Sequence, residues 1–197
     1  MGHGGRTGVR LNPHSSPEPR QASSMTASLR QTQGPFRARA VDGGLFRTVF
    51  RGHPAGVAVI TADAGTGPVG FTATSLASLS AEPPMVVFAI SCGASSWPRL
   101  RVAETFVVTL LSSQQEEVAR RFARSGIDRF ASPTRWTRLP TGEPLLDGGR
   151  AWLRCSARPP VEAGDHFLII GQVLEADADP EASPLIYHDR TFHVLPS

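Results

Sequence analysis

The stretch GPVGFTATSLASLSAEPP, residues 67–84, decides how the rest of the chain is interpreted. It begins at a glycine–proline turn, carries little charge and ends at a double proline. Its middle holds the hydroxylated residues Thr72, Thr74, Ser75, Ser78 and Ser80. Hydroxyls, free backbone N–H groups and small residues let a backbone approach a phosphate or a flat heterocycle closely. The stretch therefore predicts a cofactor-binding segment, although a strand, a turn and a second strand without any ligand share the same pattern.

The composition is that of an ordinary globular protein. The chain has 197 residues, of which 40% are hydrophobic and 19% charged, and its formal net charge is +3. This length is sufficient for one domain with a sizeable core. Every basic residue other than histidine is an arginine, which favours bidentate phosphate recognition wherever one lines a pocket. No arginine run is dense enough to indicate a nucleic-acid partner.

Two cysteines, Cys92 and Cys155, lie far apart inside apolar segments. Because no CxxC pair or Cys/His ligand spacing accompanies them, we expect buried free thiols and no metal site. No apolar run approaches the length of a membrane span, and no secretory signal is recognisable. These features predict a soluble cytoplasmic protein without a membrane partner.

Residues 1–40 differ in composition from the rest of the chain. They are rich in Gly, Ser, Pro, Gln and Arg, contain the single acidic residue Glu18, and show no apolar periodicity. Such a segment buries too little apolar surface to offset its ordering entropy, so it predicts a disordered tail ahead of a domain at 41–197. The tail faintly resembles an organelle transit peptide, and a translation start at Met25 is the other interpretation.

The pattern of the domain predicts a mainly β fold. Asp42 can cap a helix that ends at Arg51, and a capping signal at Ser112 or Ser113 predicts a second helix as far as residue 124. A shorter helix is expected at 95–103, with Trp97 and Leu100 inward. Residues 126–149 read as irregular. The predicted strands are 57–62 and 69–73, which form a hairpin, then 85–91, 105–111, 151–157, 165–176 with a bulge or bend at Gly171, and 192–195. These elements indicate a closed antiparallel barrel with a few peripheral helices.

Three segments together resemble one known family. They are Phe50 to Pro84 (FRGHPAGVAVITADAGTGPVGFTATSLASLSAEPP), Gly164 to Val173 (GDHFLIIGQV) and Pro184 to Phe192 (PLIYHDRTF). Their order and spacing resemble the flavin reductases that use an FMN-binding split barrel. The likeness is greatest to the reductase components of two-component flavin-dependent monooxygenases, and it extends over about residues 41–194. The resemblance implies an antiparallel split β-barrel that assembles as a homodimer.

The resemblance also implies a flavin site, for FMN or FAD. The segment that packs along the flavin corresponds here to Pro68, Val69, Gly70, Phe71 and Thr72. The polar edge or phosphate is reached by the positions of Thr74 and Ser75, and the stretch after the third strand adds Ser91, Ser95 and Ser96. Arg121 is expected to bind phosphate beside Phe122, whereas Arg120 and Arg124 are interpreted as a solvated helix face. Many family members carry an arginine or lysine near the position that corresponds to Ser95. In this respect the chain departs from the family pattern.

The nicotinamide cofactor is expected near the end of the chain. The resemblance assigns its contacts to Tyr187, His188, Asp189 and Arg190, and it places His166 on the nicotinamide-facing side as the catalytic candidate. A structural imidazole held by Asp165 is the alternative interpretation of His166. Relatives vary in the closing segment, so the choice between NADH and NADPH stays open.

The function implied is NAD(P)H:flavin oxidoreduction with delivery of reduced flavin to a partner monooxygenase. The cofactors carry the hydride chemistry, so no nucleophile or paired acid and base is required. Backbone N–H groups of residues 71–75 are candidates to stabilise the negative charge at the flavin N1–C2=O edge. Two alternatives remain at this point: a non-catalytic flavin-binding sensor on the same barrel, and a flavin-dependent oxidase of the pyridoxamine-phosphate oxidase-like type.

Overall fold

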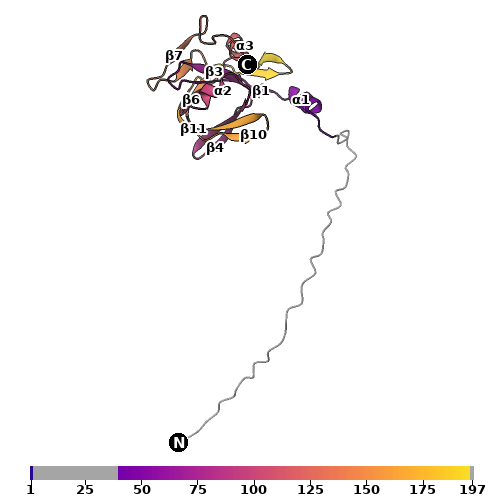
Figure 1. Cartoon of the computed structure of the whole chain (residues 1–197), viewed down its shortest axis with the longest axis vertical. Helices are drawn as coiled ribbons and strands as arrows, with labels where there is room; N and C mark the ends of the chain where they lie inside the picture. The colour runs from indigo at the N-terminus through magenta and orange to yellow at the C-terminus, as the bar shows by residue number, and fades with distance from the viewer. Residues whose placement is uncertain (2–39, 196–197) are drawn as a thin grey trace. The chain divides into compact units, whose positions relative to one another are not determined.

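The main sheet has eight strands, and each pairing between them is antiparallel. The computed structural model describes Met1 and residues 40–195 (Figure 1). The predicted tail therefore lies, except for its two end residues, outside the described part of the chain. Residues from Val41 onward belong to one compact unit.

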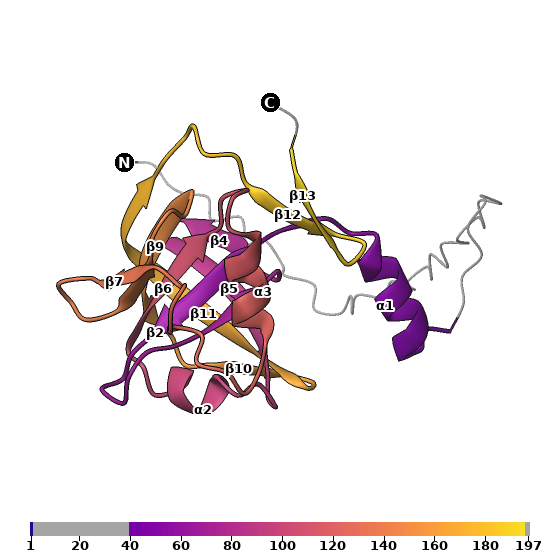
Figure 2. The ribbon, with the colours of Figure 1, turned by 90° about the horizontal axis from the view of Figure 1, so that it is seen from above.

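Along the sheet the strands follow the order β3-β2-β6-β9-β11-β5-β4, and β10 pairs with β11. Their bounds are β2 (Ala58–Ala62), β3 (Val69–Ala73), β4 (Ala77–Ala81), β5 (Pro84–Ser91), β6 (Thr105–Leu110), β9 (Ala151–Ala157), β10 (Val161–Ala163) and β11 (His166–Ala178). The sheet curls into a half-barrel with β3 and β4 at its two ends (Figure 2). The predicted split barrel and its β2–β3 hairpin are confirmed, whereas β4 and β10 were not predicted as separate strands.

Two smaller sheets and three helices complete the domain. One sheet joins β1 (Ala55–Gly56), β12 (Leu185–His188) and β13 (Thr191–Val194), and the other joins β7 (Trp136–Arg138) and β8 (Pro144–Leu146). The helices are α1 (Gly43–Arg51), α2 (Trp97–Leu100) and α3 (Glu116–Ala123). The short strands β1, β7, β8 and β12 were not predicted, because two to four residues show no usable alternation.

Aromatic rings fill the interior of the curled sheet. Phe88 and Phe106 meet edge to face at 5.4 Å between ring centroids, and both are buried. Gly171 gives Phe106 its room, since an added Cβ would lie 2.4 Å from the Phe106 Cζ atom. Of the bulge or bend predicted at Gly171, the bulge is wrong, because the register of β11 shifts between Val173 and Glu175 instead. Trp97 and Leu100 point inward as predicted.

Helix α3 is fixed against β3 by one glycine and one hydroxyl. At Gly70 an added Cβ would lie 2.8 Å from the ring of Phe122, so only glycine lets α3 come this close. The Thr72 hydroxyl donates a 2.6 Å hydrogen bond to the Ala119 carbonyl. The predicted serine cap of α3 is wrong: the helix begins after Gln115, whose side chain accepts from the Ser112 N–H.

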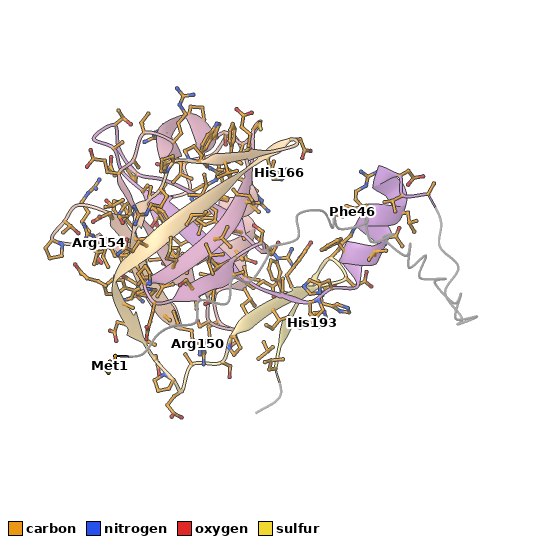
Figure 3. All side chains as sticks on the ribbon, turned by 90° about the horizontal axis from the view of Figure 1, so that it is seen from below. Met1, Phe46, Arg150, Arg154, His166 and His193 are labelled. Atoms are coloured by element: carbon orange, nitrogen blue, oxygen red, sulfur yellow. The ribbon has the colours of Figure 1, made fainter. Side chains whose placement is uncertain are left out.

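Helix α1 is capped as predicted but packs little of its surface. The Asp42 carboxylate accepts from two backbone N–H groups of the first turn, at 2.8 Å each. None of the α1 residues is buried, and Phe46, Val49 and Phe50 are all more than half exposed (Figure 3). Its last residue, Arg51, forms an ion pair with Asp189 in the β12–β13 turn. The helix thus leaves an apolar face open while its end is tied to that turn.

Candidate functional site

A cleft of about 400 Å³ is lined by the last residues of β3 and of β5. We call it the serine cleft. It brings together most of the residues predicted for the flavin, namely Phe71, Thr72, Thr74, Ser75, Ser91, Ser95, Ser96 and Phe122. The predicted catalytic candidate His166 lines the same cleft. Residues that were not predicted complete the wall, namely Ala73, Ala89, Ile90, Ala94, Ala123, Ser125 and Arg129. Hydroxyls and aromatic surface alternate along it, which suits a ligand with a flat ring and a polar tail.

Ser75, which follows β3, is hydrogen-bonded to the backbone of β5. Its hydroxyl accepts a 3.0 Å hydrogen bond from the Ala89 N–H and donates a 3.3 Å bond to the Ala89 carbonyl. Strand β4 pairs only with the first half of β5, so this side chain occupies the place of a strand partner for the second half. Ser75 therefore shapes the floor of the cleft through the backbone of β5.

Arg129 organises the far end of the cleft. Its Nη1 atom donates to the Gly70 carbonyl and to the Ser96 hydroxyl, both at 2.9 Å, and Nη2 donates to the Ser95 hydroxyl at 3.3 Å. Partial burial lowers the pKa of Arg129 from its ordinary value, yet a guanidinium remains charged at any neutral pH. This side chain places a permanent positive charge beside the serines, as a phosphate requires.

The structure places Arg121, the residue predicted for the phosphate, away from the serine cleft, whereas Arg129 lines that cleft. The Arg121 guanidinium donates to the carbonyls of Asp128 and Ser132 at 3.2 Å, and the residue lies outside the serine cleft. Phe122 and Ala119 face the barrel, and this rotation of α3 directs Arg121 toward the loop that follows. A signal for Arg129 did exist, because family members often carry a basic residue near the position of Ser95. Here that charge comes from a segment more than thirty residues further along the chain.

Pro68, Val69 and Gly70 do not line the serine cleft. They border a neighbouring cleft of about 590 Å³ together with Arg99 and Trp136. Val69 is buried in the core, and the Gly70 carbonyl is occupied by Ser96 and Arg129. Pro68, Val69 and Gly70 thus directly precede the segment from Phe71 to Ser75 that lines the serine cleft, without lining it themselves.

His166 lies at the start of β11 and lines the serine cleft. Its Nδ1 atom lies 2.7 Å from the Asp165 carboxylate, and the imidazole side chain is 44% exposed (Figure 3). The hydrogen bond with His166 lowers the pKa of Asp165 below its usual value. A carboxylate in this position orients the ring and directs Nε2 away from Asp165. The imidazole of His166 is thus hydrogen-bonded to Asp165 and also lines the serine cleft, so both interpretations of this residue are compatible with its position.

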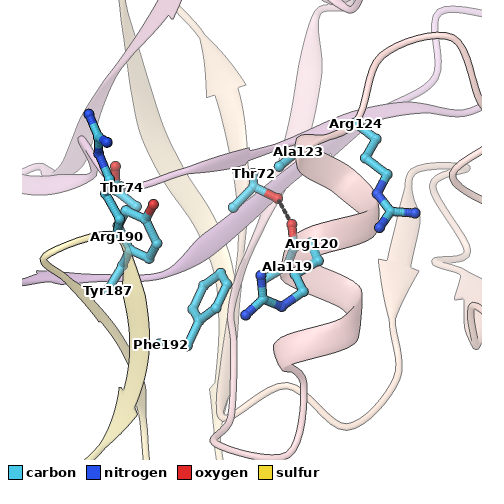
Figure 4. Close-up of a pocket in the computed structure, with 9 residues that line it drawn as sticks. All are labelled: Thr72, Thr74, Ala119, Arg120, Ala123, Arg124, Tyr187, Arg190 and Phe192. Carbon is cyan, nitrogen blue, oxygen red and sulfur yellow. Dashed lines mark hydrogen bonds between the residues drawn. The ribbon is translucent and has the colours of Figure 1, made fainter.

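A second cleft, of about 390 Å³, lies between α3 and the β12–β13 hairpin (Figure 4). We call it the arginine cleft. It shares Thr72, Thr74 and Ala123 with the serine cleft. Its other lining residues are Ala119, Arg120, Arg124, Tyr187, Arg190 and Phe192. The structure thus places the predicted Tyr187 and Arg190 next to the flavin-side threonines.

A third cleft, of about 670 Å³, extends from there to the end of α1. We call it the helix cleft. It is bordered by the hairpin residues Tyr187, His188, Asp189 and Arg190, and by Thr74 and Ser75 of the serine cleft. All four residues predicted for the nicotinamide therefore lie on one hairpin and border the helix cleft, which shares Thr74 and Ser75 with the serine cleft.

The two cysteines have different environments. Cys155 is buried, and burial raises the pKa of its thiol to about 12. Cys92 is exposed, which corrects the prediction of two buried thiols. Among the residues that the structure describes, no cluster of His, Cys, Asp and Glu is suited to hold a metal ion. No helix in that part of the chain combines the length and apolar character that a bilayer crossing requires.

Comparisons with known proteins agree with this geometry. Residues 50–196 match the family model described as "Flavin reductase like domain". The NADH:FMN oxidoreductase of Rhodococcus erythropolis is 45% identical over 163 residues, which cover 81% of this chain and 85% of that protein. The reductase subunit HsaB of a flavin-dependent monooxygenase from Rhodococcus jostii is 35% identical and covers 79% of each chain.

A solved structure is similar over the same region. It is the NADH:FAD oxidoreductase of Streptomyces globisporus in complex with NAD and FAD fragments. That structure superimposes with a TM-score of 0.75 at 33% identity and covers 81% of this chain and 98% of the other. Family model, relatives and fold agree, and the chain belongs to the flavin reductase like family.

Proposed function

We propose that this chain is an NAD(P)H:flavin oxidoreductase that supplies reduced flavin to a separate monooxygenase. The observation that carries the proposal is the serine cleft, where hydroxyls, aromatic surface and the Arg129 charge meet beside His166. Relatives named NADH:FMN oxidoreductase and monooxygenase reductase subunit support the same activity.

The residues of the serine cleft fit a flavin. Its volume of about 400 Å³ suits a mononucleotide-sized ligand, and its lining offers apolar surface from Phe71 and Phe122 as well as hydroxyl donors. We assign the phosphate end to Arg129 with Ser95 and Ser96. The ring is assigned to Thr72, Thr74 and Ser75, with backbone N–H groups of residues 71–75 at its polar edge. When bound, the flavin accepts a hydride from the reduced nicotinamide.

The protein's own contribution is to bind, orient and polarise. β3 is an end strand of the sheet, so its outer backbone groups are available to a ligand wherever the protein does not bond them. His166, oriented by Asp165, provides a proton donor or acceptor at the edge of the cleft. The nicotinamide is assigned to the hairpin residues Tyr187, His188, Asp189 and Arg190. These assignments rest on which residues line the serine cleft and the helix cleft, and on the resemblance to flavin reductases.

We infer a homodimer and a transient encounter with the monooxygenase. The exposed Phe46, Val49 and Phe50 of α1 form an apolar face of the kind that a second subunit covers. Reduced flavin can reach the oxygenase by diffusion, so a stable complex between the two enzymes is not required.

A direct assay tests the proposed activity. Purified protein is mixed with NADH or NADPH and with riboflavin, FMN or FAD, and the nicotinamide absorbance is followed without oxygen. We expect flavin-dependent loss of the nicotinamide band with at least one pair. Tight flavin binding without reduction by either nicotinamide would instead identify a flavin-binding sensor and refute the reductase.

A further inference from the structure

Ser96 occupies the position that caps helix α2, yet its side chain does not cap the helix. A serine at such a position normally accepts a hydrogen bond from a backbone N–H of the first turn. Here no such bond is formed, although Ser96 directly precedes Trp97, the first residue of α2. The residue is buried, with 1% of its surface exposed. A buried hydroxyl that is withdrawn from capping needs a partner elsewhere in the fold.

That hydroxyl joins two segments that are distant from it in the chain. It donates a 3.0 Å hydrogen bond to the Gly70 carbonyl of β3, and it accepts a 2.9 Å hydrogen bond from Nη1 of Arg129. Nη1 of Arg129 also donates to the Gly70 carbonyl, at 2.9 Å. Ser96, Gly70 and Arg129 thus form a closed triangle of hydrogen bonds. The single hydroxyl hydrogen of Ser96 is used inside this triangle, so it is not available to a ligand.

The triangle fixes the orientation of the Arg129 guanidinium. Nε of Arg129 donates to the Arg124 carbonyl at 2.8 Å, and Nη2 donates to the Ser95 hydroxyl at 3.3 Å. Of the five N–H groups of a guanidinium, four are therefore bonded within the protein, and one on Nη2 has no partner among residues 40–195. Because Arg129 lines the serine cleft, this last N–H is the one left for a ligand there.

No other arginine lines the serine cleft. The basic residue nearest to Ser96 in the sequence is Arg99, whose Nη2 atom donates to the carbonyls of Thr66 and Pro68 in the turn between β2 and β3, at 3.0 and 3.1 Å. The permanent charge of the cleft therefore comes from a loop more than thirty residues after Ser96. A long side chain that reaches the cleft from such a loop has to be held there against its own rotational freedom.

We propose that Ser96 is a positioning residue, which holds the Arg129 guanidinium in the orientation that binds the flavin phosphate. Without the hydroxyl, Nη1 of Arg129 loses one of its two acceptors, and the guanidinium gains orientations in which its fork no longer faces the phosphate. Ser96 acts through Arg129 and does not itself contact the flavin. This inference rests on the proposed function, because it requires a flavin phosphate beside Arg129.

FMN and riboflavin differ only in the phosphate, so they separate positioning of Arg129 from general damage to the cleft. Calorimetric titration measures Kd for each flavin in the wild type and in Ser96→Ala. We expect Kd for FMN to rise about fivefold and Kd for riboflavin to change less than about twofold. KM for FMN in the reaction with NADH is expected to rise with its Kd, while kcat stays the same. An unchanged Kd for FMN, or an equal rise for both flavins, would overturn the proposal.

A double-mutant cycle tests whether Ser96 acts through Arg129. In Arg129→Gln the guanidinium is absent, so adding Ser96→Ala is expected to change Kd for FMN by less than about twofold. Two independent losses that multiply in the double variant would refute the proposal. Ser113→Ala is the matched control, since this half-buried serine lines none of the three clefts and its hydroxyl has no hydrogen bond in the described part of the chain. It is expected to leave both Kd values unchanged.

Folding of each variant is monitored by thermal melting. If Ser96→Ala fails to fold, Ser96→Cys carries the same test, because a thiol fills a similar space but forms only weak hydrogen bonds. Reduction of riboflavin by NADH needs no phosphate contact and reports the reductase activity separately. A wild type that reduces riboflavin but binds FMN no more tightly than riboflavin would overturn the role of Ser96 and leave the reductase standing. A wild type that binds FMN more tightly but reduces neither flavin would refute the reductase alone.

Discussion

The Ser75 hydroxyl exchanges hydrogen bonds with both backbone groups of Ala89, at 3.0 and 3.3 Å, and so takes the place of a strand partner for the second half of β5. Replacing it with Ser75→Ala removes this link and leaves the β5 backbone groups to water. We expect a loss of about 1 kcal/mol in unfolding free energy and weaker FMN binding, measured by urea denaturation and by flavin titration. Ser78→Ala, an exposed serine of β4 with no side-chain hydrogen bond among the described residues, is the matched control. Equal stability of the two variants would contradict this role.

Arg129 joins three parts of the serine cleft through its guanidinium. Arg129→Gln removes both the charge and the fork, so Kd for FMN is expected to rise about tenfold or more. Riboflavin lacks the phosphate, and its Kd is expected to change much less. An equal rise in Kd for FMN and for riboflavin would show that Arg129 shapes the cleft without contacting the phosphate. Arg121→Gln provides the comparison, because that guanidinium lies outside the cleft.

His166 and Asp165 allow orientation to be separated from direct contact. With His166→Asn, kcat/KM for NADH is expected to fall about tenfold, since the cleft loses its titratable group. Asp165→Asn keeps the imidazole and weakens only its orientation, so a smaller decrease, about threefold, is expected. A kcat/KM for NADH in His166→Asn equal to that of the wild type would assign His166 a structural role.

Gly70 determines how closely α3 approaches β3. In Gly70→Ala the new methyl group would lie 2.8 Å from both the Phe122 ring and the Ile60 carbonyl, so helix or strand must move. We expect a loss of about 2 kcal/mol in unfolding free energy together with weaker flavin binding. Gly56→Ala is the control, because an added Cβ there meets no atom within 4 Å. A Gly70→Ala protein as stable as the control would contradict the close packing.

The buried carboxylate of Glu143 pairs with Arg154, and this pair makes the unfolding free energy depend on pH in the acid range. Burial alone raises its pKa, but hydrogen bonds from Thr105, Thr141 and Arg154 outweigh this and lower it to about 2, from an ordinary value of 4.5. A depressed folded pKa stabilises the protein fully above about pH 4.5, and this contribution disappears as the pH falls through about 2. Glu143→Gln should therefore cost about 3 kcal/mol at pH 7 and progressively less toward pH 2, by urea denaturation. A cost that is constant with pH would refute the assignment.

The elements that the sequence predicted correctly are those determined by residues close together in the chain. The β-branched run at residues 57–61 and the glycine-rich turn after it specify the β2–β3 hairpin on their own, and Asp42 marks the start of α1. The choice between Arg121 and Arg129 depends on the rotation of α3, which is set by contact between Gly70 and Phe122 across the fold. Such a contact between distant segments leaves no periodic signal in the sequence. The same holds for Gly171, where the ring of Phe106 leaves no room for a side chain.

Strand β3 lies at one end of the sheet, where free backbone groups could pair with another chain. The Gly70 carbonyl is already held by Ser96 and Arg129, so the protein itself occupies this backbone group of the edge. Phe71, Thr72 and Ala73 of the same strand line the serine cleft. A ligand bound there covers more of the edge, so bound flavin is expected to reduce aggregation during storage or heating.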